Sequence, residues 1–184
     1  METSYLASII KQFEYYKSLG DKTLNQLTFE DIQWQSNEGS NSIAIIVKHV
    51  AGNMLSRWTN FLSEDGEKEW RQRDKEFIDS FKTSEDLIAA WESGWACLFN
   101  AISPLKNDDL ERIIYIRNQG HTITEAINRQ LAHYSYHIGQ MVFLGKLIKG
   151  DDWQSLSIPK GNSLKYNEDK FAKEKGKRHF TDDL

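Results

Sequence analysis

Apolar side chains recur at roughly helical spacing in four segments of the chain, which predicts four long helices. The first segment runs from about Thr3 to Leu27. Its inward-facing positions are expected to be Tyr5, Ile9, Phe13, Tyr16, Leu24 and Leu27. The second segment follows the loop-like residues QSNEGSN. Asn41 or Ser42 can cap its start, because short polar side chains accept a hydrogen bond from the first free backbone N–H groups, and the pattern continues to about Leu62.

The third and fourth segments carry clearer end signals. The third opens at Thr83 or Ser84, with acidic residues in its first turn that complement the helix dipole, and it must end before Pro104. The fourth begins with a capping box formed by Thr122 and Glu125. It continues to about Lys149, after which Gly150 can adopt a positive φ.

The remaining segments are predicted to connect these helices. The stretch SEDGEKEWRQRDKEF is expected to be a long polar connection, and the run RIIYI with the turn-like RNQG predicts a small hairpin. Residues 151–184 form a tail with a predicted short helix around Asp169–Lys175. The apolar side chains of Trp153, Leu156 and Ile158 favour packing of the tail on the rest of the chain, and they leave open whether it acts as a lid.

Composition favours one mostly helical domain. The chain has 184 residues, only two prolines, and 39% apolar residues, which suffices for a single core. We therefore expect an all-α domain over residues 1–150, followed by the tail at 151–184 packed on or beside it.

Charge and cysteine content exclude several classes of protein. The formal net charge of −4 gives no electrostatic reason to bind nucleic acid or an anionic membrane, and the basic run KEKGKRH is typical of a solvated tail. A single cysteine, Cys97, rules out an intrachain disulfide framework, and no segment resembles a secretory signal or a membrane span. These features predict a cytoplasmic protein.

Histidines are the residues most suggestive of chemistry. On the fourth helix, His133 and His137 fall on the same stripe as apolar residues that should face the core: Ala126, Met141, Leu144 and Ile148. Side chains one turn apart can reach one metal ion at about 2.0–2.1 Å. A histidine on an apolar face is more often a hydrogen-bonded core residue than a metal ligand, and such a pair arises by chance in about one chain in ten of this composition.

A third histidine changes this balance. His49 on the second helix shares its face with Gly52, Asn53 and Ser56, whose small side chains leave room beside it. His49 could therefore meet the other pair across a helical core. His121 is expected in a loop twelve residues from His133, and His179 lies in the basic tail without an evident partner.

The segments VKHVAGN and HYSYHIGQ together resemble the two motifs of the DinB/YfiT-like superfamily, and the resemblance covers roughly residues 3–150. It implies an up-down-down-up four-helix bundle, often a homodimer, with His49, His133 and His137 as the ligands of one divalent metal ion. The tail segment SLSIPKG is similar to one branch of that superfamily. Zn²⁺, Ni²⁺ and Fe²⁺ all suit three imidazoles, so the ligand set leaves the metal open.

The resemblance further implies metal-dependent transfer of a low-molecular-weight thiol, such as bacillithiol, to an electrophile, or a related hydrolysis. Position 134 is tyrosine, where a His-Glu-x-x-His protease has glutamate, and the chain lacks the cysteine pair of a nucleobase deaminase. No carboxylate suggests itself as a third ligand or as a base. Two alternatives stay open: a metal that only stabilises the fold, and a helical interaction protein with structural histidines. Gln140, three residues after His137, can orient a ligand or lie between helices.

Overall fold

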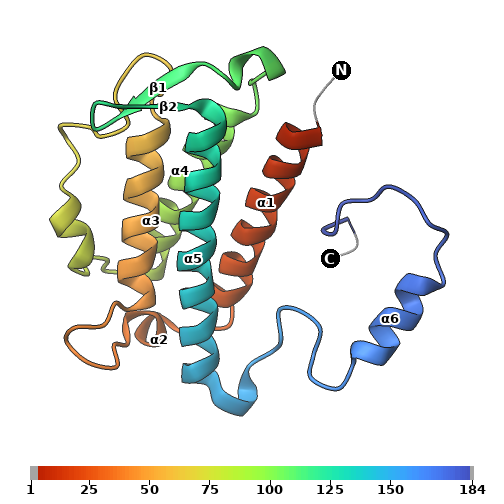
Figure 1. Cartoon of the computed structure of the whole chain (residues 1–184). Coiled ribbons are helices and arrows are strands. Elements are labelled where there is room, and N and C mark those ends of the chain that lie inside the picture. Colours follow the sequence, from red (N-terminus) through yellow and green to blue (C-terminus); the bar gives the residue numbers. More distant parts are fainter. Residues whose placement is uncertain (1–3, 183–184) are drawn as a thin grey trace.

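The structure is predominantly helical. It is a computed structural model that describes residues 4–182, within which four long helices lie side by side (Figure 1): α1 (Ser4–Leu24), α3 (Ile43–Trp58), α4 (Ser84–Ile102) and α5 (Ile123–Lys149). Shorter elements connect them: α2 (Phe29–Gln33), the 3-10 turns η1 (Arg73–Phe77), η2 (Asn107–Asp109) and η3 (Gly150–Asp152), and the strands β1 (Ile113–Ile116) and β2 (Gln119–Thr122). A last helix, α6 (Ser163–Phe171), lies in the tail.

The predicted helix starts are confirmed where the sequence carries caps. Ser42 and Thr83 accept hydrogen bonds from the backbone N–H groups three residues on, and Thr122 forms the full capping box with Glu125. The prediction that the second long helix reaches Leu62 is wrong. It ends at Trp58, because the backbone turns at Asn60, which has a φ of 48°. The predicted start of the first helix at Thr3 lies outside the described residues.

The predicted hairpin is also confirmed. Strand β1 pairs antiparallel with β2, and the turn residues Arg117 and Asn118 have φ values of 57° and 58°, as a tight two-residue hairpin turn requires. His121 therefore lies on β2, and the expectation of a loop position was wrong. The run of isoleucines in β1 forms a strand because its alternate side chains, Ile114 and Ile116, are buried against the helices.

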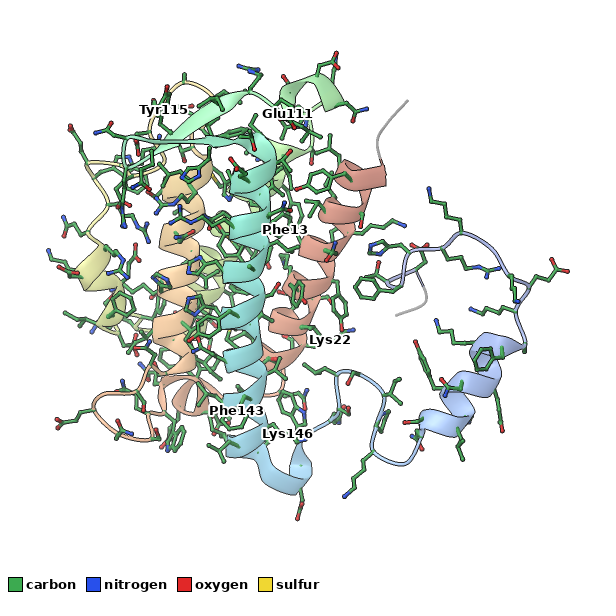
Figure 2. The ribbon with its side chains drawn as sticks, in the orientation of Figure 1. Phe13, Lys22, Glu111, Tyr115, Phe143 and Lys146 are labelled. Carbon is green, nitrogen blue, oxygen red and sulfur yellow. The ribbon has the colours of Figure 1, made fainter. Side chains whose placement is uncertain are left out.

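Aromatic side chains fill the space between the helices. Helix α3 packs against α4 and α5, and α1 packs against α5 and α4. Phe13 lies between α1 and α5 (Figure 2), in edge contact with Trp95 and close to Tyr134. Trp91 and Trp95 are buried core residues, as their spacing predicts. At the centre of this core, Trp58 Nε1 donates to the Tyr134 hydroxyl at 3.1 Å, and that hydroxyl donates to Asn53 at 3.0 Å, which joins α3 to α5.

The tail lies against α1, on the side away from α3 (Figure 1). Gln154 exchanges hydrogen bonds with Gln26, and His179 contacts Ser8 at 3.2 Å, so His179 does have a partner. The predicted position of the tail helix was wrong, since α6 ends at Phe171. It begins earlier because the turn at Gly161, whose φ is 90°, permits a helix start directly after it.

Among residues 4–182, no helix combines the length and hydropathy needed to cross a lipid bilayer.

Candidate metal site

Three imidazoles converge between α3 and α5. His49 lies on α3, and His133 and His137 lie one turn apart on α5. The Nε2 atom of His133 lies 3.3 Å from that of His49 and 3.1 Å from that of His137. One nitrogen from each residue lies within 4.8 Å of the other two, so the three side chains could hold a single metal ion.

The distances between these nitrogens suit a shared cation. Two nitrogen ligands at about 2.0–2.1 Å from one ion lie roughly 2.9 Å apart for octahedral and 3.4 Å apart for tetrahedral angles. The observed separations of 3.1 and 3.3 Å fall in this interval. Neither His121 nor His179 belongs to the cluster.

A buried carboxylate orients His49. Glu76, in η1, accepts a hydrogen bond from His49 Nδ1 at 2.9 Å. Its two oxygens also accept bonds from Arg71 Nε at 2.8 Å and Arg71 Nη2 at 2.9 Å. Gly52 leaves the space for this carboxylate, because a Cβ at that position would lie 2.5 Å from Glu76 Oε1. The Phe77 ring stacks on the His49 ring, with 5.1 Å between the ring centroids.

Hydrogen bonds at Nδ1 determine which nitrogens carry lone pairs. His49 must donate from Nδ1, since the carboxylate of Glu76 only accepts, and its Nε2 is then a bare acceptor. His137 Nδ1 lies 2.8 Å from Gln140 Oε1, which places the lone pair of His137 on Nε2 in the same way. His133 Nε2 can donate to one of these two atoms but not to both. A cation at the meeting point would satisfy all three lone pairs, so the residues fit a divalent metal ion.

The surroundings lower the pKa values of His133 and His137. Burial lowers the pKa of His133 to about 3, and electrostatic interactions with His137, His49, Arg57 and Arg71 act in the same direction. Burial also lowers the pKa of His137, although its bond to Gln140 opposes this. Burial alone would raise the pKa of Glu76, but the hydrogen bonds from His49 and Arg71 outweigh it and hold that pKa below its usual value. Neutral imidazoles beside an ionised carboxylate are what metal ligation requires.

The segment between α3 and α4, expected to be a plain connection, supplies the residues that sequence reasoning missed: Arg71, Glu76 and Phe77. Ser56 on α3 fixes this segment, since its hydroxyl donates to Gly66 O at 2.7 Å and accepts from Lys68 N at 3.3 Å. Sequence reasoning identified no carboxylate as a ligand or a base, and the structure shows Glu76 in a different role, as the hydrogen-bond partner of His49 Nδ1. The small residues beside His49 were the one sequence signal for this carboxylate, because the Glu76 side chain occupies the space that the missing side chain of Gly52 leaves.

A family model described as a protein of unknown function (DUF1572) matches residues 1–162, which include all of the site residues described above. The chain belongs to this family. No curated protein and no solved structure matches the sequence significantly. The description of this family names no activity, so the site is the feature of this DUF1572 member that bears on its function.

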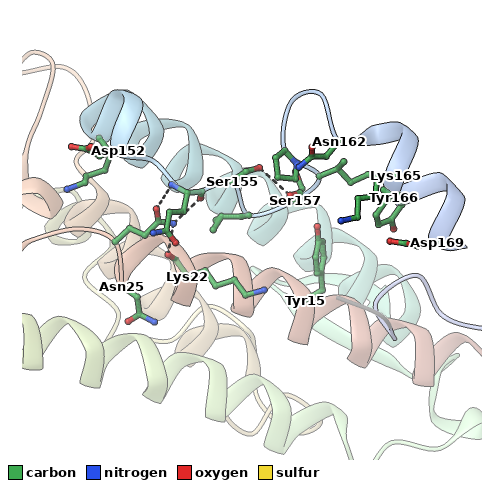
Figure 3. Close-up of a pocket in the computed structure, with 16 residues that line it drawn as sticks. Tyr15, Lys22, Asn25, Asp152, Ser155, Ser157, Asn162, Lys165, Tyr166 and Asp169 are labelled. Atoms are coloured by element: carbon green, nitrogen blue, oxygen red, sulfur yellow. Dashed lines mark hydrogen bonds between the residues drawn. The ribbon is translucent and has the colours of Figure 1, made fainter.

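The DUF1572 chain has two cavities that bear on this argument. The larger, of about 1000 Å³, lies between α1 and the tail, with Tyr15 and Lys22 on one side and Tyr166 on the other (Figure 3). It contains none of the three histidines. A smaller cavity, of about 230 Å³, is lined by His49 and His133. The tail segment with Leu156 and Ile158 thus lies at the larger cavity, and the space next to the imidazoles is bounded by other elements.

The low pKa of His133 predicts how acid affects the metal-free protein. The unfolded chain binds a proton near the ordinary value of 6.5, whereas folded His133 does so only at about 3. Between these pH values the unfolded state holds more protons, so the free energy of unfolding should fall as the pH drops below 6.5 and should be insensitive to this group above it. Urea unfolding in the presence of a chelator, at about pH 7 and about pH 5, measures this loss of stability with pH. The slope, which is the change in the free energy of unfolding between the two pH values, should be smaller in His133→Gln. An equal slope in the variant would contradict the assignment.

Proposed function

We propose that this DUF1572 chain is a DinB/YfiT-like metalloprotein in which His49, His133 and His137 hold one divalent ion, Zn²⁺, Ni²⁺ or Fe²⁺. The observation that supports this most is the convergence of three Nε2 atoms, two of which, those of His49 and His137, have their lone pairs directed to the meeting point by hydrogen bonds at Nδ1. The same proposal takes α1, α3, α4 and α5 as the four-helix bundle of that superfamily.

We further propose that the site transfers a low-molecular-weight thiol to an electrophile. A divalent ion held only by neutral imidazoles keeps its full charge and lowers the pKa of a bound thiol or water. The overall reaction is R–SH + R′–X → R–S–R′ + X⁻ + H⁺: a sulfur–carbon bond forms, the leaving group departs with its electron pair, and the thiol proton passes to solvent.

The chain's own residues would position the reactants. Glu76 and Gln140 fix the two imidazole rings through Nδ1, and the cavity of about 230 Å³ beside His49 and His133 offers space for a small substrate. Phe77 covers one face of His49 and limits the access of water there. Glu76 itself is fully engaged by His49 and Arg71, which suits an orienting group better than a base.

The test uses untagged protein loaded with Co²⁺, whose spectrum reports thiolate coordination. We expect one ion per chain by elemental analysis, a sulfur-to-cobalt charge-transfer band on adding a small thiol, and conjugation across a panel of thiols and electrophiles. His133→Gln should lose all three, and His179→Gln, which changes a histidine outside the cluster, should lose none.

A second function has its own support. An ion at this point would join α3 and α5 and, through Glu76, the segment between α3 and α4, so it could stabilise the fold without catalysis. Metal binding without a charge-transfer band or conjugation would favour this function. Protein without stoichiometric metal would exclude both and leave a helical interaction protein.

The homodimer implied by the resemblance stays a prediction. Exposed Tyr136, Phe143 and Leu147 lie along one face of α5 and offer an apolar surface for it.

A further inference from the structure

Arginines gather in the cavity next to the three imidazoles. Of the described residues, five arginines line this space of about 230 Å³, together with His49 and His133, and no acidic residue lines it: Arg57, Arg71, Arg73, Arg117 and Arg129. They come from α3, from the segment before α4, from the hairpin turn and from α5. Distant parts of the chain therefore bring positive charge to one small volume.

The neighbouring carboxylates do not balance these charges. Glu67 lies 3.2 Å from Arg57, 3.0 Å from Arg117 and 3.7 Å from Arg71. Glu76 forms an ion pair with Arg71. Asp65 accepts the backbone N–H groups of the hairpin turn at 2.8 Å. Even with all three counted, five guanidinium groups exceed three carboxylates by two positive charges.

Two of the five arginines have no carboxylate partner in the described part of the chain. Within residues 4–182, neither Arg73 nor Arg129 forms an ion pair, and the recorded contact of Arg73 is with the face of Phe77, at 5.2 Å. Arg129 lies four residues before His133 on α5, which is one helical turn from an imidazole of the cluster.

Buried N–H groups without acceptors lie in the same place. The Arg71 side chain is only 2% exposed, yet among residues 4–182 its Nη1 has no hydrogen-bond partner, and neither has Nε of buried Arg57. An unsatisfied buried donor costs about 1–3 kcal/mol, and more for a charged group. The charge of Arg71 also helps burial to lower the pKa of Arg57, so the two guanidinium groups repel each other. A negatively charged oxygen in the cavity would relieve both effects.

We propose that this cavity binds a compact oxyanion, a carboxylate or a phosphate group. Guanidinium groups bind both through paired N–H···O bonds, and a cavity of about 230 Å³ holds one such group with a short linker. The inference rests on the function proposed above in one respect: the anionic group then belongs to the thiol or the electrophile whose reacting end approaches the imidazoles. Substrates without a negative charge would lose this contact.

Isothermal titration of the full chain with inorganic phosphate and with succinate, in metal-free form, tests the site without any activity measurement. Either anion binding to the wild-type protein supports the proposal, and the stronger of the two identifies the group. Arg129→Gln and Arg73→Gln change exposed side chains without ion-pair partners, so both variants should fold, and each should weaken binding at least 10-fold. Arg112→Gln, an exposed arginine near β1 that pairs with Asp109 outside the cavity, is the matched control and should bind as the wild type does.

The proposal is overturned if neither anion binds, or if the two cavity variants bind as tightly as Arg112→Gln. Resonances of the arginine Nε–H groups in ¹⁵N-labelled protein give a second measurement: those of Arg57 and Arg71 should shift with phosphate or succinate, and that of Arg112 should not. Metal content is measured on protein from the same preparations before the metal is removed. Anion binding by protein that lacks stoichiometric metal would exclude the proposed metal function and support the anion site. Stoichiometric metal without anion binding would exclude the anion site alone.

Discussion

Replacing His133 by glutamine should abolish stoichiometric metal binding. His133 is the central member of the cluster, since its Nε2 lies 3.3 Å from that of His49 and 3.1 Å from that of His137. Without it, two ligands on different helices remain. We expect affinity for Zn²⁺ to fall by more than the roughly 10–100-fold that follows from changing an outer hydrogen-bond partner of a metal site. Competition with a chromophoric chelator measures the affinity.

The same variant should lose metal-dependent stability. An ion that binds only the folded state raises the free energy of unfolding by about 2.7 kcal/mol when its concentration is 100 times the dissociation constant. Chelation should therefore lower the melting temperature of the wild-type protein and leave that of His133→Gln almost unchanged. The control, His179→Gln, alters a histidine whose contacts are with α1 and the tail, and it should behave as the wild type. A His133→Gln protein that keeps one ion per chain would refute the three-histidine site.

Local sequence signals located the main helices because caps act over three or four residues. The Thr122–Glu125 box and the cap at Ser42 gave the starts of α5 and α3 correctly. The end of α3 was misplaced because the apolar residues Phe61 and Leu62 continue the helical pattern past Asn60, whose φ of 48° breaks the helix. Helix α2 was missed, since five residues are too few to show a period.

The candidate site was predictable only in part. Helical spacing puts His133 and His137 on one face, and a helical wheel shows the small residues around His49, but their meeting point was given by the family resemblance. Glu76 could not be placed, because its contact with His49 spans 27 residues and depends on the path of the segment that Ser56 and Gly66 fix. A polar run shows no periodicity from which such a path could be read. The convergence of the five cavity arginines could not be predicted either, because they are far apart in the sequence and meet only through the path of the chain.

The second large effect is expected at Glu76. Glu76→Gln removes the charge that compensates Arg71, and both side chains are more than nine-tenths buried. Breaking a buried ion pair from one side leaves an uncompensated charge, which costs about 3–5 kcal/mol. For this conservative variant we expect a loss of about 3 kcal/mol in the free energy of unfolding, measured by urea denaturation of the metal-free protein. Asp74→Asn, an exposed change in the same short turn, is the control and should stay within about 0.5 kcal/mol.

Metal affinity distinguishes the two roles that Glu76 could have. As the partner of His49 Nδ1 it keeps the lone pair on Nε2, so Glu76→Gln should also weaken Zn²⁺ binding by roughly 10–100-fold. Gly52→Ala tests the same role independently and should also weaken Zn²⁺ binding. Its new Cβ would displace the Glu76 carboxylate from His49, while the charge of Glu76 is retained. If both variants bind Zn²⁺ as tightly as the wild type while Glu76→Gln is destabilised, Glu76 serves only to hold Arg71. If both lose affinity, the carboxylate acts on the metal site through His49.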